Sequence, residues 1–267
     1  MQSLGRIGAV FLRYAYLHKH SLPRTLEIFF WPVMDLLVWG FVSVYVQSLS
    51  PHSPARIGAA LINAMIFWDI LYRIQQGVSI PFVEDIWTQN IVNMLISPLK
   101  IREWIAATFL YGLAKTTVIT LILAFLAGLL YHFNLMGNLG IYLAPLAFNL
   151  LLFGWAVGIF TTGLILRWGH AAEALIWGIP FLIQPLSAVY YPLSTLPGWL
   201  AWISRLLPST YAFEGMRVVN AGERLPKSYL LAAFGLNLVY IALAGLFFNL
   251  MYRSARVSGR LGRLGMD

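Results

Sequence analysis

Residues 228–252 read SYLLAAFGLNLVYIALAGLFFNLMY and include no charged side chain. An α-helix rises about 1.5 Å per residue, so a helix of this length crosses the roughly 30 Å hydrocarbon core of a bilayer. Five further apolar stretches occupy most of the remaining chain, at 27–47, 57–79, 103–130, 140–166 and 172–191. Inside a bilayer the backbone must satisfy its own hydrogen bonds, which favours helices. The sequence therefore predicts an all-α integral membrane protein with six transmembrane helices in a single domain, residues 1–267.

The composition excludes several other classes of protein. The chain is 60% hydrophobic and 10% charged, and it has no cysteine, which rules out disulfides, thiolate metal sites and thiol catalysis. Its net charge is +8. The basic residues flank apolar spans, so we expect them to face an anionic leaflet and predict no nucleic-acid binding.

The distribution of Lys and Arg predicts the orientation. Most of the 18 Lys and Arg residues lie on the side that holds both ends of the chain. The largest groups are Arg6, Arg13, Lys19 and Arg24 before the first span, and Arg253, Arg256, Arg260 and Arg263 after the last. Because cytoplasmic loops carry the excess of basic residues, both termini are predicted to be cytoplasmic.

The N-terminal residues 3–22 do not resemble a span. Leu4, Ile7, Phe11, Tyr14 and Leu17 recur at helical spacing, with basic residues between them. This pattern predicts an amphipathic helix that lies in the membrane interface.

Two connections are too long to be simple turns. The cytoplasmic one predicts a short helix at 81–96, with Glu84 and Asp85 in its first turn and Pro98 ending it after Ser97. The external one, 193–225, is too apolar for a solvated loop, and its apolar runs are too short to span a bilayer. It predicts a pair of short re-entrant or interfacial helices.

The charged residues that we predict at membrane depth are Asp35, Asp69 and Lys115. Charge at membrane depth is costly, so we expect Lys115 to pair with Asp35 or Asp69. Such a pair would either fix helix packing or belong to a proton relay. Gly154 and Gly158 form a GxxxG pattern, which predicts a close approach between helices.

Motifs for chemistry are missing from the sequence. There is no GxxxxGK[ST] phosphate-binding loop, no HExxH metal motif and no GxSxG nucleophile elbow. We therefore predict no catalytic residue, no metal site and no cofactor bound to this chain.

One cytoplasmic stretch carries a family resemblance. Glu84-Asp85-Ile86-Trp87, followed by Asn93-Met94-Leu95-Ile96-Ser97-Pro98-Leu99, is similar to the acidic E-x-G-T-x-x-x-L-x-x-S-P segment of the type-2 ATP-binding-cassette (ABC) exporter permeases. Trp87 and Gln89 depart from the small residues often found there. The order of an amphipathic helix, six spans, a cytoplasmic helix and a re-entrant external element also resembles that family.

The resemblance implies a function and a set of partners. The chain would be the membrane subunit of an exporter, most simply a homodimer around a translocation path in a bacterial inner membrane, in contact with its lipids. Two separate cytoplasmic ABC ATPase subunits would bind ATP and Mg²⁺. The helix at 81–96 would be the coupling helix, with ATPase contacts at Glu84, Asp85, Ile86, Trp87, Asn90, Asn93 and Met94. The external element would form an outer gate, with substrate contacts at Tyr190, Tyr191, Trp199, Trp202, Tyr211 and Phe213.

Two other functions remain open at this point. An ion-coupled secondary transporter would use Asp35, Asp69 and Lys115, although no internal repeat is evident. A membrane enzyme acting on lipids would need a polar catalytic cluster near one interface. The cargo, whether drug, lipid or glycan, is not indicated by the sequence.

Overall fold

The computed structural model describes residues 2–49 and 54–258, which fold as helices without a strand in either range. The long helices are α1 (Gln2–Lys19), α2 (Leu22–Leu49), α3 (Pro54–Trp87), α5 (Ile101–Tyr131), α7 (Leu143–Trp168) and α11 (Lys227–Val257). The shorter ones are α4 (Ile91–Ile96), α6 (Leu135–Leu139), α8 (Leu175–Leu186), α9 (Gly198–Ser204) and α10 (Pro208–Asn220). Three 3₁₀ turns join them: η1 (Gly140–Tyr142), η2 (Gly169–Ala172) and η3 (Leu193–Thr195).

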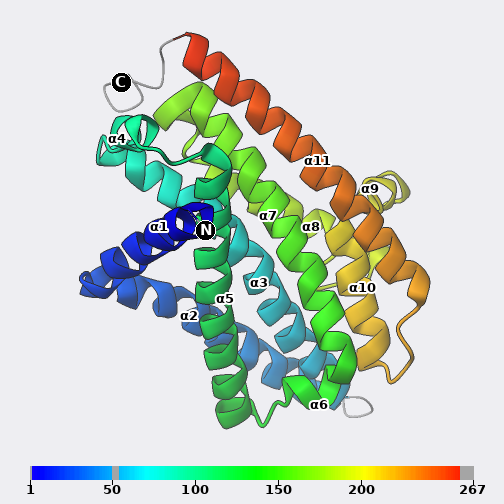
Figure 1. The fold of residues 1–267 in the computed structure, drawn as a ribbon. Helices are drawn as coiled ribbons and strands as arrows, with labels where there is room; N and C mark the ends of the chain where they lie inside the picture. The colour runs from blue at the N-terminus through cyan, green and yellow to red at the C-terminus, as the bar shows by residue number, and fades with distance from the viewer. Residues whose placement is uncertain (1, 50–53, 259–267) are drawn as a thin grey trace.

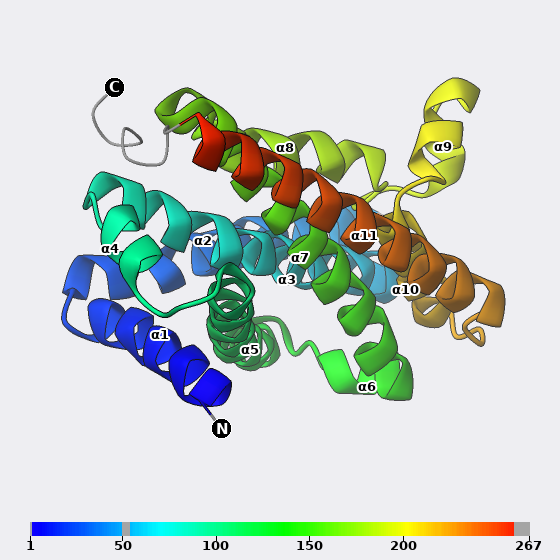
Figure 2. The same cartoon turned by 45° about the horizontal axis from the view of Figure 1, so that its top comes forward.

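Helix α3 lies in the middle of the bundle, packed against α2, α5 and α7 (Figure 1). Helix α11 covers the opposite side of α7, and α1 crosses the long helices at a steep angle while packing on α5 (Figure 2). The predicted helix at 3–22 is therefore present as α1, and it contacts the bundle through the fully buried side chain of Tyr14.

Glycines allow α3 to approach both of its neighbours closely. A Cβ atom built on Gly77 would lie 2.6 Å from the Cα of Gly112 on α5. On the other face, Cβ atoms at Gly154 and Gly158 of α7 would lie 2.6 Å and 2.9 Å from backbone carbonyl oxygens of α3. The close approach predicted from the GxxxG pattern is confirmed.

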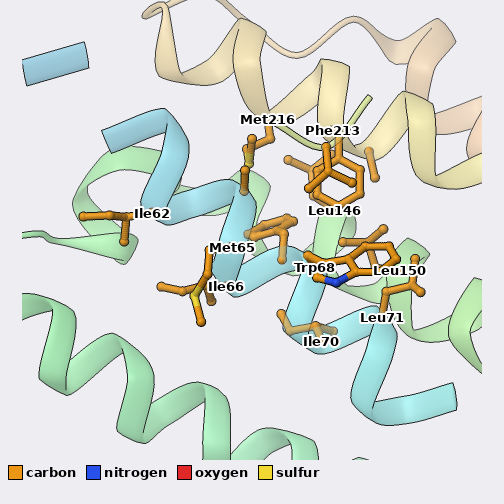
Figure 3. Close-up of a cluster of buried hydrophobic side chains, with 14 of the residues drawn as sticks. Ile62, Met65, Ile66, Trp68, Ile70, Leu71, Leu146, Leu150, Phe213 and Met216 are labelled. Carbon is orange, nitrogen blue, oxygen red and sulfur yellow. The ribbon is translucent and has the colours of Figure 1, made fainter. Parts of the chain in front are cut away.

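The larger apolar core surrounds the first half of α3. Figure 3 shows Leu146 and Leu150 of α7 and Phe213 and Met216 of α10 packed around Trp68 and its neighbours on α3. A second cluster joins the other end of α3 to α4, α5, α7 and α11, and includes Ile86, Ile91, Trp104 and Ala255.

The outer surface of the bundle is apolar, as a lipid-facing surface must be. Four helical segments in the described residues are long and apolar enough to cross a membrane: Leu22–Leu49, Ile101–Tyr131, Leu135–Trp168 and Lys227–Val257. They contain the predicted spans 27–47, 103–130, 140–166 and 228–252. The predicted span 57–79 lies inside α3, which is not among these four.

The span predicted at 172–191 is shorter than expected. Its helix, α8, has 12 residues and covers about 18 Å. After α8 the backbone turns at Ala188, whose φ is +52°. The Arg217 side chain of α10 donates to the carbonyl oxygens of Ala188 and Val189 at 2.6 Å and 3.2 Å, which stabilises this turn.

The prediction of a single helix at 81–96 is wrong. Helix α3 continues through Pro81 as far as Trp87, so Glu84 and Asp85 lie in its last turn and not in the first turn of a new helix. The chain breaks at Gln89, whose φ is +53°, and α4 follows separately. The predicted end before Pro98 is confirmed, because Ser97 is extended with ψ 161°.

Candidate functional site

Asp85 lies at the end of α3 and is 1% exposed. Its carboxylate accepts hydrogen bonds from the Arg13 guanidinium, from the Tyr14 hydroxyl at 2.7 Å and from the Asn90 side-chain amide at 3.1 Å. The Trp104 indole of α5 in turn donates to the Tyr14 oxygen at 3.0 Å. One buried carboxylate thus joins α1 to α3 and, through Tyr14, to α5.

Burial, together with the charge of Asp85, raises the pKa of Tyr14 well above its usual range. The phenol therefore stays protonated and remains a hydrogen-bond donor to Asp85 at physiological pH.

Two more ion pairs lie at the same end of the bundle. Arg6 of α1 binds Glu103 of α5 through two hydrogen bonds of 2.7 Å and 2.6 Å. Arg24, at the start of α2, lies 3.6 Å from Glu84. We call these three pairs the inner ion-pair cluster; it consists of Arg6, Arg13, Arg24, Glu84, Asp85 and Glu103.

The sequence interpretation missed this cluster. It had treated Arg6 and Arg13 only as interfacial basic residues. Their spacing of seven residues puts both on one face of α1, which was the available signal for a common partner surface.

Beside the cluster, the end of α3 and the helix α4 present an exposed surface. Its exposed side chains are Trp87, Thr88, Gln89, Asn93 and Ile96, which we call the α3–α4 surface. Trp87 is 54% exposed and its indole donates to Glu173 at 3.2 Å; Ile96 is 79% exposed. Trp87 and Ile96 are thus large apolar side chains that this surface leaves exposed.

The predicted ATPase-contact residues divide into three groups by exposure. Trp87 and Asn93 are exposed, and Glu84, Asn90 and Met94 are half-buried. Asp85 and Ile86 are buried, so they support the surface from inside and do not contact a partner. Thr88, Gln89 and Ile96, which the sequence interpretation left out, are exposed instead.

The predicted pairing of Lys115 with Asp69 is wrong. Asp69 pairs with Arg73, four residues along the same helix, at 2.9 Å. No ion pair of Lys115 or Asp35 is found within the described residues. Arg73, which falls within the predicted span 57–79, is 6% exposed inside the bundle.

Asp35 and Asp69 nevertheless lie on one cavity. Its volume is about 250 Å³, and it lies between α2, α3 and α8. The lining residues are Asp35, Trp39, Met65, Trp68, Asp69, Tyr72, Pro180, Phe181, Gln184 and Tyr190.

The predicted outer-gate residues lie in different environments. Tyr190 stacks on Trp39 of α2, with ring centroids 3.9 Å apart. Trp199 and Trp202 of α9 are 69% and 63% exposed. Phe213 is fully buried in the larger core, so its predicted role as a substrate contact is wrong.

The remaining two, Tyr191 and Tyr211, each donate to a backbone carbonyl, those of Pro185 and Arg205 at 2.8 Å and 3.0 Å. Their hydroxyls therefore stabilise the local turns. No group of three or more metal-ligating side chains occurs in the part of the chain that the structure describes.

A comparison with protein families identifies the class of this bundle. The model of the ABC-2 type transporter family matches residues 20–220, about three quarters of the chain. The chain belongs to the ABC-2 type transporter family. The resemblance to the type-2 permeases is thereby confirmed, and this multi-pass membrane protein is a transport component of an ABC transporter, which is not itself catalytic. No curated protein matches the chain in a sequence search.

Proposed function

We propose that this ABC-2 permease is the membrane subunit of an ATP-driven exporter, working as a homodimer with two separate cytoplasmic ABC ATPase subunits. The observation that carries the proposal is the α3–α4 surface, which is exposed yet rigidly supported by the inner ion-pair cluster. ATP and Mg²⁺ would bind to the partner subunits.

In the proposed topology the chain crosses a bacterial inner membrane six times, with α3 and the α8 region as the second and fifth crossings. Both termini would be cytoplasmic. In support, Val10 of α1, Met94 of α4 and Tyr252 of α11 pack on one apolar cluster, so α1 and the last turns of α11 lie at the same end of the bundle. That end also carries the basic residues that favour the cytoplasmic side.

The proposed coupling uses the connections of Asp85. Force applied by an ATPase to the α3–α4 surface would act directly on α3, because Trp87 belongs to that helix. It would also act on α1 through Arg13 and Tyr14. The short external helices α9 and α10, which the sequence predicted as a re-entrant pair, would respond at the outer side as a gate.

The test is purification of the tagged chain from its host in mild detergent, with mass spectrometry of the partners. We expect a P-loop ATPase in about equal amount, and we expect Trp87→Ala to reduce its recovery by about tenfold, in the range of a lost hot-spot side chain. Trp199→Ala is the matched control, because Trp199 is also an exposed tryptophan but belongs to α9, far from α4 (Figure 2).

Recovery of the chain alone, in a stable and active form, would contradict the proposal. It would favour the ion-coupled transporter that uses Asp35, Asp69 and Lys115. Equal loss of the ATPase in both tryptophan variants would contradict the assignment of the α3–α4 surface.

A further inference from the structure

The cavity between α2, α3 and α8 has aromatic walls. Trp39 stacks on Tyr190 with ring centroids 3.9 Å apart, and Trp68 stacks on Tyr72 with centroids 6.4 Å apart. Phe181 of α8 lies 6.5 Å from Tyr72, measured between ring centroids. All five rings line the cavity. The faces of such rings carry negative electrostatic potential, and they attract cations.

The same cavity is lined by two carboxylates, and they differ in whether a basic side chain pairs with them. Asp69 is 4% exposed and its charge is balanced by Arg73 at 2.9 Å. Asp35 has no ion-pair partner among residues 2–49 and 54–258, and neither Arg73 nor Lys115 contributes to the cavity wall. The wall therefore carries one carboxylate for which the described residues provide no ion pair.

The depth of Asp35 makes this charge significant. It lies eight residues into the predicted span 27–47, about 12 Å from the start of that span. An unpaired carboxylate at such depth is costly, and ionisable residues there normally mark a ligand or ion pathway.

We infer that this cavity binds an organic cation, an ammonium group carried on an apolar body, with Asp35 as its counter-ion and the rings as its walls. The inference rests on the proposed function, since it names the chemical class of the transported molecule. At about 250 Å³ the cavity is smaller than the roughly 300–1,000 Å³ of sites that enclose whole drug-sized molecules. It therefore holds the ammonium head, while the apolar body extends out of it.

The test is direct binding to the full chain in lipid nanodiscs, without an ATPase. The probe is radiolabelled phenyltrimethylammonium, and benzenesulfonate, an aromatic probe of similar size and opposite charge, is the comparison. Discs without protein give the partition background. We expect saturable binding of the cation only, and a loss of about tenfold or more in affinity for Asp35→Asn, which removes the charge with little change of shape.

Glu27→Gln is the matched control, because Glu27 is an exposed carboxylate on the same helix, outside the cavity. It should bind the probe as the unchanged chain does. Equal binding of benzenesulfonate, or unchanged affinity in Asp35→Asn, would overturn the inference. Neither result would affect the co-purification of an ATPase, so the inference and the proposed function fail separately.

The lipid composition of the discs identifies the source of the ammonium group. In discs of phosphatidylglycerol alone no lipid carries an amine. If added phosphatidylethanolamine competes with the probe, the ligand is a lipid headgroup; if probe binding is unchanged, the ligand is a soluble cation. Both results support a cation site at Asp35.

Discussion

The carboxylate of Asp85 is buried with three donors from two other parts of the chain, on α1 and at Asn90. A buried charge is tolerated only when it is paired and hydrogen-bonded, and here every donor comes from a different side chain. Arg13, in contrast, keeps 35% of its side chain exposed. Removing Arg13 should therefore change the free energy of unfolding by a different amount from removing the charge of Asp85.

We expect Arg13→Ala to lower the free energy of unfolding by about 3 kcal/mol, because it leaves Asp85 buried with reduced pairing. Asp85→Asn should cost only about 1 kcal/mol, since the released Arg13 reaches solvent. Thermal unfolding of the purified chain in detergent measures both.

Arg24→Ala is the control for this comparison. Its pair with Glu84 is longer, at 3.6 Å, and Arg24 is 38% exposed, so the loss should stay below about 1 kcal/mol. An Asp85→Asn variant less stable than Arg13→Ala would contradict the asymmetry.

Single residues also show where sequence reasoning succeeded. Asp35 and Asp69 were identified as unusual from their position in apolar spans, and the structure brings both to one cavity. The partner of Asp69 was misjudged, although an i,i+4 Asp–Arg pair is visible in the sequence.

Among the elements, α3 has the closest contacts with its neighbours. Where it passes α5, Gly77 meets the backbone of Gly112 directly, and the Ile74 side chain lies beside this contact. Helices in membranes gain stability from such contacts through dispersion, because lipid competes with any looser packing.

We expect Gly77→Ala to separate α3 from α5, since its Cβ would lie 2.6 Å from a backbone atom that has no flexible side chain to move. The cost should be about 1–3 kcal/mol, as for other overpacked sites, with reduced recovery of monodisperse protein in size-exclusion chromatography.

Gly235→Ala on α11 is the matched control. A Cβ there meets nothing within 4 Å, so this variant should be neutral or more stable by up to about 1 kcal/mol. Equal stability and equal recovery of the two variants would show that the α3–α5 contact accommodates a methyl group without loss of stability.

The sequence predicted the presence of helices with long apolar runs well. It predicted the residues at which helices begin and end less well. The helices that contain 27–47, 103–130 and 228–252 follow from length and apolarity alone. In contrast, the apolar run at 172–191 continues past the end of α8, because the turn at Ala188 is stabilised by Arg217, a distant residue. Pro81 suggested a helix start, yet α3 continues through it because the surrounding side chains are buried.

At the scale of the whole molecule, α1 and α4 lie at a different end of the bundle from the turn between α10 and α11. Helix α1 packs beside the start of α5 through Arg6 and Glu103, and α4 lies close by, whereas the turn between α10 and α11 lies at the start of α11 (Figure 1). The proposed orientation places α1 and α4 on the cytoplasmic side and this turn outside.

This orientation can be tested directly, since the chain has no cysteine. We expect Thr88→Cys to react with a membrane-impermeant maleimide only in inside-out vesicles, and Glu223→Cys only in right-side-out vesicles or intact spheroplasts. Both positions are exposed in the structure. Labelling of both from the same side would contradict an odd number of crossings between them.

Helix α3 has a further consequence as a single covalent element. It carries Asp69, on the cavity, and Asp85, at the inner cluster, sixteen residues and about 24 Å apart along its axis. A displacement of α3 at one site therefore reaches the other through the helix itself, without a chain of side-chain contacts. The glycine contacts on both faces present few interlocking side chains, and Pro81 removes one backbone hydrogen bond between the two carboxylates. A change in the position or tilt of α3 is thus sufficient to relate events at one membrane surface to the shape of the cavity between α2, α3 and α8.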